Sequence, residues 1–163
     1  MREILFRGQT RRKGEKVYMG TGKPVDGNWV YGGITQGTGD FSVMYSYDPV
    51  EKHVVYTDTI GQFTGLTDKN GKKIFEGDIV VSKYSNGEIC CIGDVQFDFG
   101  VFGVEWSHNK KNRGMVGSFG QKHNLRKFDD GFAKNVEIVG NIHDNPELLE
   151  DEDGNKSGGK GSA

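Results

Sequence analysis

The chain has little of what marks a secreted, membrane-spanning or disulfide-stapled protein. Its 163 residues include two cysteines and three prolines, and the formal net charge of −2 leaves neither sign dominant. Cys90 and Cys91 are neighbours, and adjacent residues do not readily reach disulfide geometry, so a reducing cytosol is expected. The start, Met1 to Gly8, is too short and too charged for a signal peptide, and no apolar run approaches the ~20 residues of a membrane helix.

Signatures of catalysis and cofactor binding are lacking as well. The four histidines and the cysteine pair have no zinc-ligand spacing, and no glycine lies in a phosphate-binding loop context. We interpret five carboxylates as structural, because turns and exposed strand faces normally carry acids. They are Asp58, Asp68, Glu76, Asp78 and Glu88. The sequence therefore predicts no catalytic residue, no cofactor and no metal ligand, while a Cys-His nucleophile pair stays open.

Glycine is abundant, with 26 residues beside ten Phe, six Tyr and two Trp. Glycine marks tight turns and bulges, and large rings supply most of the burial that a small core needs. Turn signals recur roughly every 8–12 residues, a spacing typical of small barrels and sandwiches. Composition and spacing together predict an all-β protein with many Gly-rich turns.

Alternation predicts which face of one strand is buried. Phe41, Val43, Tyr45 and Tyr47 occupy every second position, so we expect these four side chains to form a single buried face. Other strands are indicated by short apolar or β-branched runs. The expected strands are 2–7, 29–31, 41–47, 54–56, 73–75, 79–81, 89–92, 94–99, 101–106 and 136–139.

Turn chemistry predicts the connections. Asn70-Gly71 and Asn86-Gly87 are strong hairpin signals, and Thr35 to Asp40 is expected to be a loop. Gly93 is expected to be a bulge between two strands. Asn145-Pro146-Glu147 combines a capping residue, a first-turn proline and an acid, which predicts one short C-terminal helical turn.

Four motifs follow one another in a fixed order along the chain. They are Arg2-Glu3-Ile4-Leu5-Phe6-Arg7-Gly8, Gly27-Asn28-Trp29-Val30-Tyr31-Gly32, the long stretch from Asp58 to Val80 that contains Glu76-Gly77-Asp78, and Val136 to Leu149. Together these motifs resemble the YopX family of phage and prophage proteins. The resemblance implies an SH3-type small barrel with additional N-terminal strands, a phage or prophage origin, and so a location in the cytoplasm of a bacterial host. It implies no activity, because the family has no established function to carry over.

We expect three regions in the chain. Residues 1–57 form an N-terminal β segment packing on the barrel, and residues 58–149 form the SH3-like barrel core with a basic loop at 107–130. Residues 150–163 contain no large apolar side chain and are expected to be disordered.

The basic loop is the strongest candidate contact surface in the sequence. The stretch from Ser107 to Phe128 contains no Asp or Glu, and cations with interleaved rings suit single-stranded nucleic acid. A solvated loop attracted to the acidic tail is the alternative. The candidate contact residues are Trp106, His108, Lys110, Lys111, Arg113, Lys122, Arg126 and Lys127.

Three classes of function stay open from the sequence. An accessory module that binds a host or phage protein, or nucleic acid through the basic loop, fits a small barrel with exposed faces. A structural subunit of a phage particle or of a homo-oligomer is the first alternative, since unpaired strand edges can be buried by self-association. An enzyme is the least supported class, because no nucleophile–base, metal or phosphate signature is present.

Overall fold

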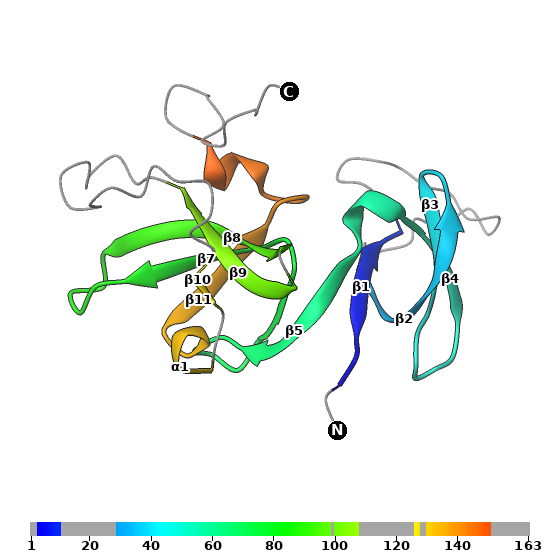
Figure 1. Cartoon of the computed structure of the whole chain (residues 1–163), viewed down its shortest axis with the longest axis horizontal. Helices are drawn as coiled ribbons and strands as arrows, with labels where there is room; N and C mark the ends of the chain where they lie inside the picture. The colour runs from blue at the N-terminus through cyan, green and yellow to red at the C-terminus, as the bar shows by residue number, and fades with distance from the viewer. Residues whose placement is uncertain (1–2, 11–28, 99, 108–125, 128–129, 151–163) are drawn as a thin grey trace. The chain divides into compact units, whose positions relative to one another are not determined.

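The computed structural model covers the whole chain and describes residues 3–10, 29–98, 100–107, 126–127 and 130–150. The chain divides into two compact units, Met1–Gly65 and Leu66–Ala163 (Figure 1). The elements of the first unit are β1 (Phe6–Gln9), β2 (Trp29–Thr38), β3 (Phe41–Tyr45), β4 (Lys52–Tyr56), the 3-10 turn η1 (Thr57–Thr59) and the start of β5 (Gly61–Thr67). Those of the second are the end of β5, β6 (Lys73–Phe75), β7 (Asp78–Lys83), β8 (Ile89–Asp98), β9 (Val101–Ser107), β10 (Arg126–Lys127), α1 (Asp130–Ala133), β11 (Val136–Asn141) and η3 (Pro146–Leu149).

The chain is nearly all β, as predicted, with two antiparallel sheets. One sheet has the strand order β4-β3-β2-β1-β5-β6 and the other β10-β9-β8-β7-β11. The predicted C-terminal helical turn is confirmed as η3, which begins with Pro146 and has Glu147 in its first turn. Asn145 precedes it without a side-chain capping bond. Closure into an SH3-type barrel, and the packing of residues 1–57 against it, stay predictions.

Two strands of the first unit differ from their predicted limits. The first strand was expected at residues 2–7, but β1 runs over Phe6–Gln9, where Arg7 and Gln9 lie opposite Tyr31 and Trp29 of β2. The loop expected from Thr35 to Asp40 is wrong for its first four residues, since β2 continues to Thr38 and pairs with β3, and only Gly39 and Asp40 form the turn. Glycine lowers strand propensity, but here the pairing of this part of β2 with β3 outweighs that local preference.

The buried face of β3 is the opposite of the predicted one. Ser42 and Met44 are buried, whereas Phe41 and Tyr45 are 49% and 40% exposed. Met44 Sδ lies only 2.9 Å from where a side chain on Gly8 would begin, so the missing side chain of β1 makes room for the methionine. The alternation correctly placed Phe41 and Tyr45 on one face, but the core of this unit is on the other. Phe41 instead packs on the neighbouring β4 ring of Tyr56, with centroids 4.9 Å apart.

A hydrophobic cluster fills the second unit. Its buried members are Ile74, Val80, Val95, Val104, Ala133 and Val136, and Leu66, Phe102, Trp106, Phe132 and Ile138 pack against them. Both predicted hairpin turns are present, with Gly71 and Gly87 at φ of +81° and +86°. These left-handed conformations suit glycine, which has no Cβ to clash.

Gly93 is not a bulge, which corrects the sequence prediction. It lies inside the continuous strand β8 and pairs regularly with Val80 and Trp106. A Cβ at this position would lie 2.3 Å from the carbonyl oxygen of Glu105, so glycine is needed for close approach of two strands. The register shift of β8 occurs earlier, between the positions opposite Ser82 and Lys83.

Candidate binding site in the first unit

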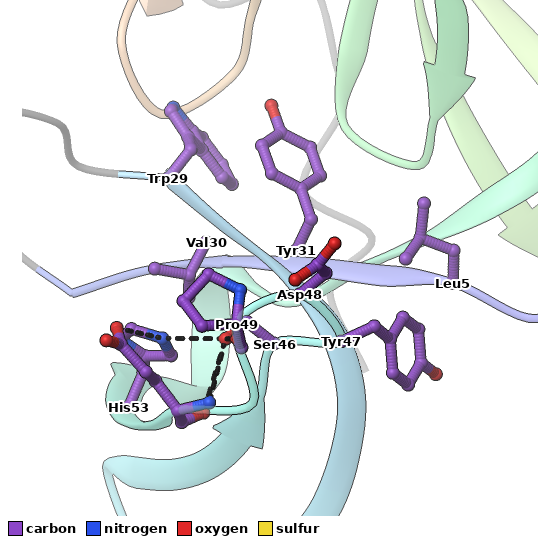
Figure 2. A pocket seen from close by; sticks show the side chains of 10 residues that line it. Leu5, Trp29, Val30, Tyr31, Ser46, Tyr47, Asp48, Pro49 and His53 are labelled. Atoms are coloured by element: carbon purple, nitrogen blue, oxygen red, sulfur yellow. Dashed lines mark hydrogen bonds and ion pairs between the residues drawn. The ribbon is translucent and has the colours of Figure 1, made fainter.

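An open pocket of about 440 Å³ lies in the first unit (Figure 2). Its wall is built from the residue before β1, the beginning of β2, the β3–β4 connection and one residue of β4. Among the described residues, the lining consists of Leu5, Trp29, Val30, Tyr31, Ser46, Tyr47, Asp48, Pro49, Glu51 and His53. A concave site with a few polar groups among apolar ones is the usual form of a ligand site.

Hydrogen bonds hold the β3–β4 connection in place. The backbone N–H of Ser46 donates to the carbonyl of Glu51 at 3.0 Å, and the N–H of Glu51 donates to Ser46 Oγ at 3.1 Å. Ser46 Oγ in turn donates to the carbonyl of Pro49 at 2.6 Å. The Asp48–Pro49 peptide is cis. The hydrogen bonds of Ser46 make the connection a tight, internally bonded turn that contains Tyr47 and Asp48.

Three aromatic rings line the pocket. Tyr31 and Tyr47 are 47% and 60% exposed, and Trp29 lies two residues before Tyr31 on the same face of β2 (Figure 2). The guanidinium of the buried Arg7 lies 4.6 Å from the centroid of the Trp29 ring. That contact shows that an aromatic ring of this wall already stacks with a cation within the chain.

The charge of the lining is acidic. Asp48 and Glu51 contribute carboxylates, and none of the described lining residues is Lys or Arg. His53 Nε2 lies 3.9 Å from Glu51 Oε2. A pocket with carboxylates and exposed ring faces can bind a cationic group by ion pairing and by cation–π attraction.

Ser46, Glu51 and His53 contain the residue types of a hydrolytic triad, but their geometry differs from one. Ser46 Oγ lies 3.4 Å from His53 Nε2, and Glu51 Oε2 lies 3.9 Å from the same ring nitrogen. A triad needs the acid on one ring nitrogen and the nucleophile on the other. The Ser46 hydroxyl also donates to Pro49, so it serves the turn. The three side chains therefore do not have the arrangement of an acyl-transfer triad.

The predicted basic contact residues are only partly described. Trp106 lies on β9, is half-buried and meets Phe132 edge-on, with ring centroids 5.9 Å apart. Arg126 and Lys127 form β10, opposite Val104 and Gly103 of β9. Five other candidates lie outside the described residues: His108, Lys110, Lys111, Arg113 and Lys122. The basic loop as a contact surface stays a prediction.

Two of the acids interpreted as structural are buried and hydrogen-bonded to the backbone. Asp68 is 3% exposed and accepts the N–H groups of Asn70, Lys72 and Ile138. Asp78 is 2% exposed and accepts the N–H of Phe75 at 2.8 Å. In the part of the chain that the structure describes, no group of three or more His, Cys, Asp or Glu side chains is placed to hold a metal ion.

Sequence reasoning missed the pocket of the first unit. Tyr47 was expected on a buried strand face, because period-two alternation does not say which face meets the core. One signal was present in the segment Tyr45-Ser46-Tyr47-Asp48-Pro49, where rings and a carboxylate surround a turn-forming proline. Exposed aromatic residues at a turn are more often contact residues than core residues.

Fold and site define an all-β protein of two units that presents an acidic, aromatic pocket. The chain belongs to the YopX family, because the model of that family, described as "YopX protein", matches residues 30–150. It is also similar to a solved structure titled "Crystal structure of protein EF1440 from Enterococcus faecalis". That similarity has 31% identity, covers 68% of this chain and 76% of the other, and has a TM-score of 0.34. No curated protein matches the chain. In the described residues, no helix has the length and hydrophobicity to span a membrane.

Proposed function

We propose that the protein is a non-enzymatic accessory binding module of phage or prophage origin that acts in the cytoplasm of a bacterial host. Its partner is a protein that inserts a basic side chain into the pocket of the first unit. The single observation that carries this proposal is the combination of three aromatic rings and two carboxylates around one open pocket. The partner binds by surface complementarity, and no chemical step is required of the site.

The ring faces supply the first part of the recognition. Tyr31 and Tyr47 are 47% and 60% exposed, so part of each ring is accessible to a partner. An arginine side chain stacks on such rings through its planar guanidinium, with an attraction of roughly 0.5–2 kcal/mol that grows as water is excluded. Tyrosine is also enriched where binding energy concentrates in protein interfaces.

The carboxylates supply selectivity. Asp48 and Glu51 both line the pocket, so a cationic side chain that enters it would be attracted by their negative charges. An acidic or phosphorylated partner would be repelled by the same groups. The charge therefore favours basic proteins over nucleic acid at this pocket.

The test uses three Gly-Ser peptides that are identical except at the central residue, which is arginine, norleucine or glutamate. An isotope-labelled sample is titrated by NMR at low and moderate salt. The arginine peptide is expected to shift the Trp29 indole and the backbone amides of Tyr31 and Tyr47, with weaker shifts at higher salt. Asp48→Asn should weaken binding several-fold, whereas the exposed Asp40, outside the pocket, should tolerate Asp40→Asn without effect. Equal shifts with all three peptides, or none, would contradict the proposal.

Nucleic-acid binding through residues 107–130 is the second candidate function. It is favoured by the sequence from Ser107 to Phe128, which contains six Lys and Arg residues and no Asp or Glu. The same sample is titrated with short single- and double-stranded DNA and RNA. Salt-sensitive shifts at Trp106 and at β10 would support this function, and Lys110→Ala with Lys111→Ala and Arg113→Ala should then flatten the salt dependence. Unchanged spectra with every nucleic acid would remove it.

Light scattering over a wide concentration range tests the assembly alternative, which predicts species larger than a monomer.

A further inference from the structure

Two thiol side chains touch at the beginning of β8 in the second unit. The Sγ atoms of Cys90 and Cys91 are 3.3 Å apart, and both residues are half-buried. In a regular strand, successive side chains point to opposite faces of the sheet, which would separate the two sulfurs. Their contact therefore requires a local departure from regular strand geometry.

A β-bulge provides that departure. In the β7–β8 ladder, Ser82 pairs with Cys91 and Lys83 pairs with Ile89, so Cys90 is the extra residue of β8. Bulges reorient side chains and are common beside functional sites. Here the bulge brings the two neighbouring thiols into contact, and both cysteines are partly exposed.

The pair is poorly suited to oxidation into a disulfide. Consecutive Cα atoms are about 3.8 Å apart across a trans peptide, which is below the ~4.4 Å lower end of ordinary disulfides. The sulfurs would also have to approach to about 2.05 Å. A disulfide formed under such strain is easily reduced, so the dithiol is the prevailing form.

The same distance suits chelation of a single ion. Two bonds of about 2.3 Å, the length of a zinc–thiolate bond, meet at about 90° when the sulfurs are 3.3 Å apart. A tetrahedral angle would need a separation of about 3.8 Å with those bonds. Structural zinc also takes four ligands, and the described residues supply no group of three or more ligand side chains. Soft thiolates select soft ions, and a trivalent arsenic centre, whose three bonds lie near right angles, needs only two protein sulfurs and one further ligand.

We propose that Cys90 and Cys91 form a chelating dithiol site for soft, thiophilic centres of low coordination number, for which an organoarsenic(III) compound is the probe. With phenylarsine oxide, two As–S bonds form and the As=O bond breaks. The two thiol protons leave with the oxygen as one water molecule, and no electrons are transferred. This site is separate from the pocket of the first unit and does not depend on its function.

The experiment measures phenylarsine oxide binding to the full chain by native mass spectrometry and thermal unfolding. We expect one probe per chain, binding at least tenfold tighter to the folded protein than to the same chain in denaturant, and a raised Tm, because a ligand that prefers the native state stabilises it. Cys90→Ser and Cys91→Ser are matched single-thiol variants, checked for folding by circular dichroism, and each should lose at least tenfold in affinity. Retained affinity in either variant, or equal affinity in denaturant, would overturn the site.

Oxidised glutathione provides the second measurement. The strained geometry predicts a mixed disulfide with glutathione on one thiol. An intrachain disulfide as the stable product, seen as the loss of two hydrogens without added glutathione, would show that the pair is built for oxidation and would overturn the chelating role.

Discussion

Replacement of Asp68 is expected to destabilise the second unit strongly, because this buried carboxylate accepts three backbone hydrogen bonds. Its side chain is buried at 3% exposure and accepts three backbone N–H groups. Oδ1 accepts from Asn70 at 2.8 Å and from Lys72 at 2.9 Å, which closes the β5–β6 turn. Oδ2 accepts from Ile138 at 3.1 Å, which ties that turn to β11. One carboxylate thus joins segments separated by 70 residues in sequence.

The magnitude follows from what each N–H group loses in Asp68→Ala. Asn70 and Lys72 are exposed turn residues, so we assign each of their N–H groups the loss of a net hydrogen bond of roughly 0.5–1.5 kcal/mol. The amide of Ile138 is part-buried, and an unsatisfied donor there costs roughly 1–3 kcal/mol. The expected loss in unfolding free energy is roughly 2–6 kcal/mol, a large fraction of the roughly 5–15 kcal/mol of a typical domain. Asp68→Asn keeps one acceptor oxygen for the turn but faces Ile138 with an amide donor, so it should lose roughly 1–3 kcal/mol.

The assay is urea unfolding followed by tryptophan fluorescence in a Trp29→Phe background. The chain has two tryptophans, so Trp106 then reports the second unit alone. Asp40→Ala, at an exposed position of the first unit, is the control and should change stability by less than about 0.5 kcal/mol. Hydrogen exchange in Asp68→Asn should accelerate at the Ile138 amide first. A loss below about 1 kcal/mol in Asp68→Ala would refute the reasoning, because it would mean that water replaces all three bonds at no cost.

Two electrostatic predictions concern carboxylates of the second unit. Hydrogen bonds from Lys69 and then Lys83, at 2.6 and 2.8 Å, lower the pKa of Glu137 from 4.5 to about 2. The stabilisation from this group is therefore complete above its unfolded pKa and is lost as pH falls through about 2. A carboxyl NMR titration of Glu137 should show that midpoint, and Lys69→Met should raise it. A midpoint near 4.5 in the unsubstituted protein would contradict the pairing. Burial, opposed in part by a hydrogen bond from Gln96, raises the pKa of Asp94 above 3.8, and Glu105 lies directly opposite it. The loss of folding stability caused by the charged Asp94 is absent below pH 3.8 and complete above its raised folded pKa. Asp94→Asn should therefore stabilise the protein by roughly 0.2–1 kcal/mol at pH 7 and not at pH 3. Thermal unfolding at both pH values checks this, and equal effects at the two would count against it.

Local features of the chain were predictable where the physics is local. Asn-Gly pairs adopt left-handed turn conformations, and both predicted turns, at Gly71 and Gly87, are present with positive φ. The helical turn at Pro146 was likewise predictable from its own residues. The all-β class follows from composition, and the order of motifs indicated the family.

Features that depend on a partner strand were not predictable. The rings at Phe41 and Tyr45 share a face, as their spacing requires, but Met44 and the space beside Gly8 place the core on the other side. Gly93 signals a special backbone position, and only the carbonyl of Glu105 on β9 shows that the reason is close approach and not a bulge.

The order of residues alone was enough to predict the all-β class, the two Asn-Gly turns, the family and the lack of a recognisable catalytic motif. The folded chain was needed to show which face of β3 is exposed, that Tyr31 and Tyr47 share a pocket with Asp48, and that two neighbouring thiols touch. The physical reason is the range of the forces involved. Backbone preferences are set by a residue and its immediate neighbours, whereas burial and strand register depend on residues that are distant in sequence and meet only when the sheet forms.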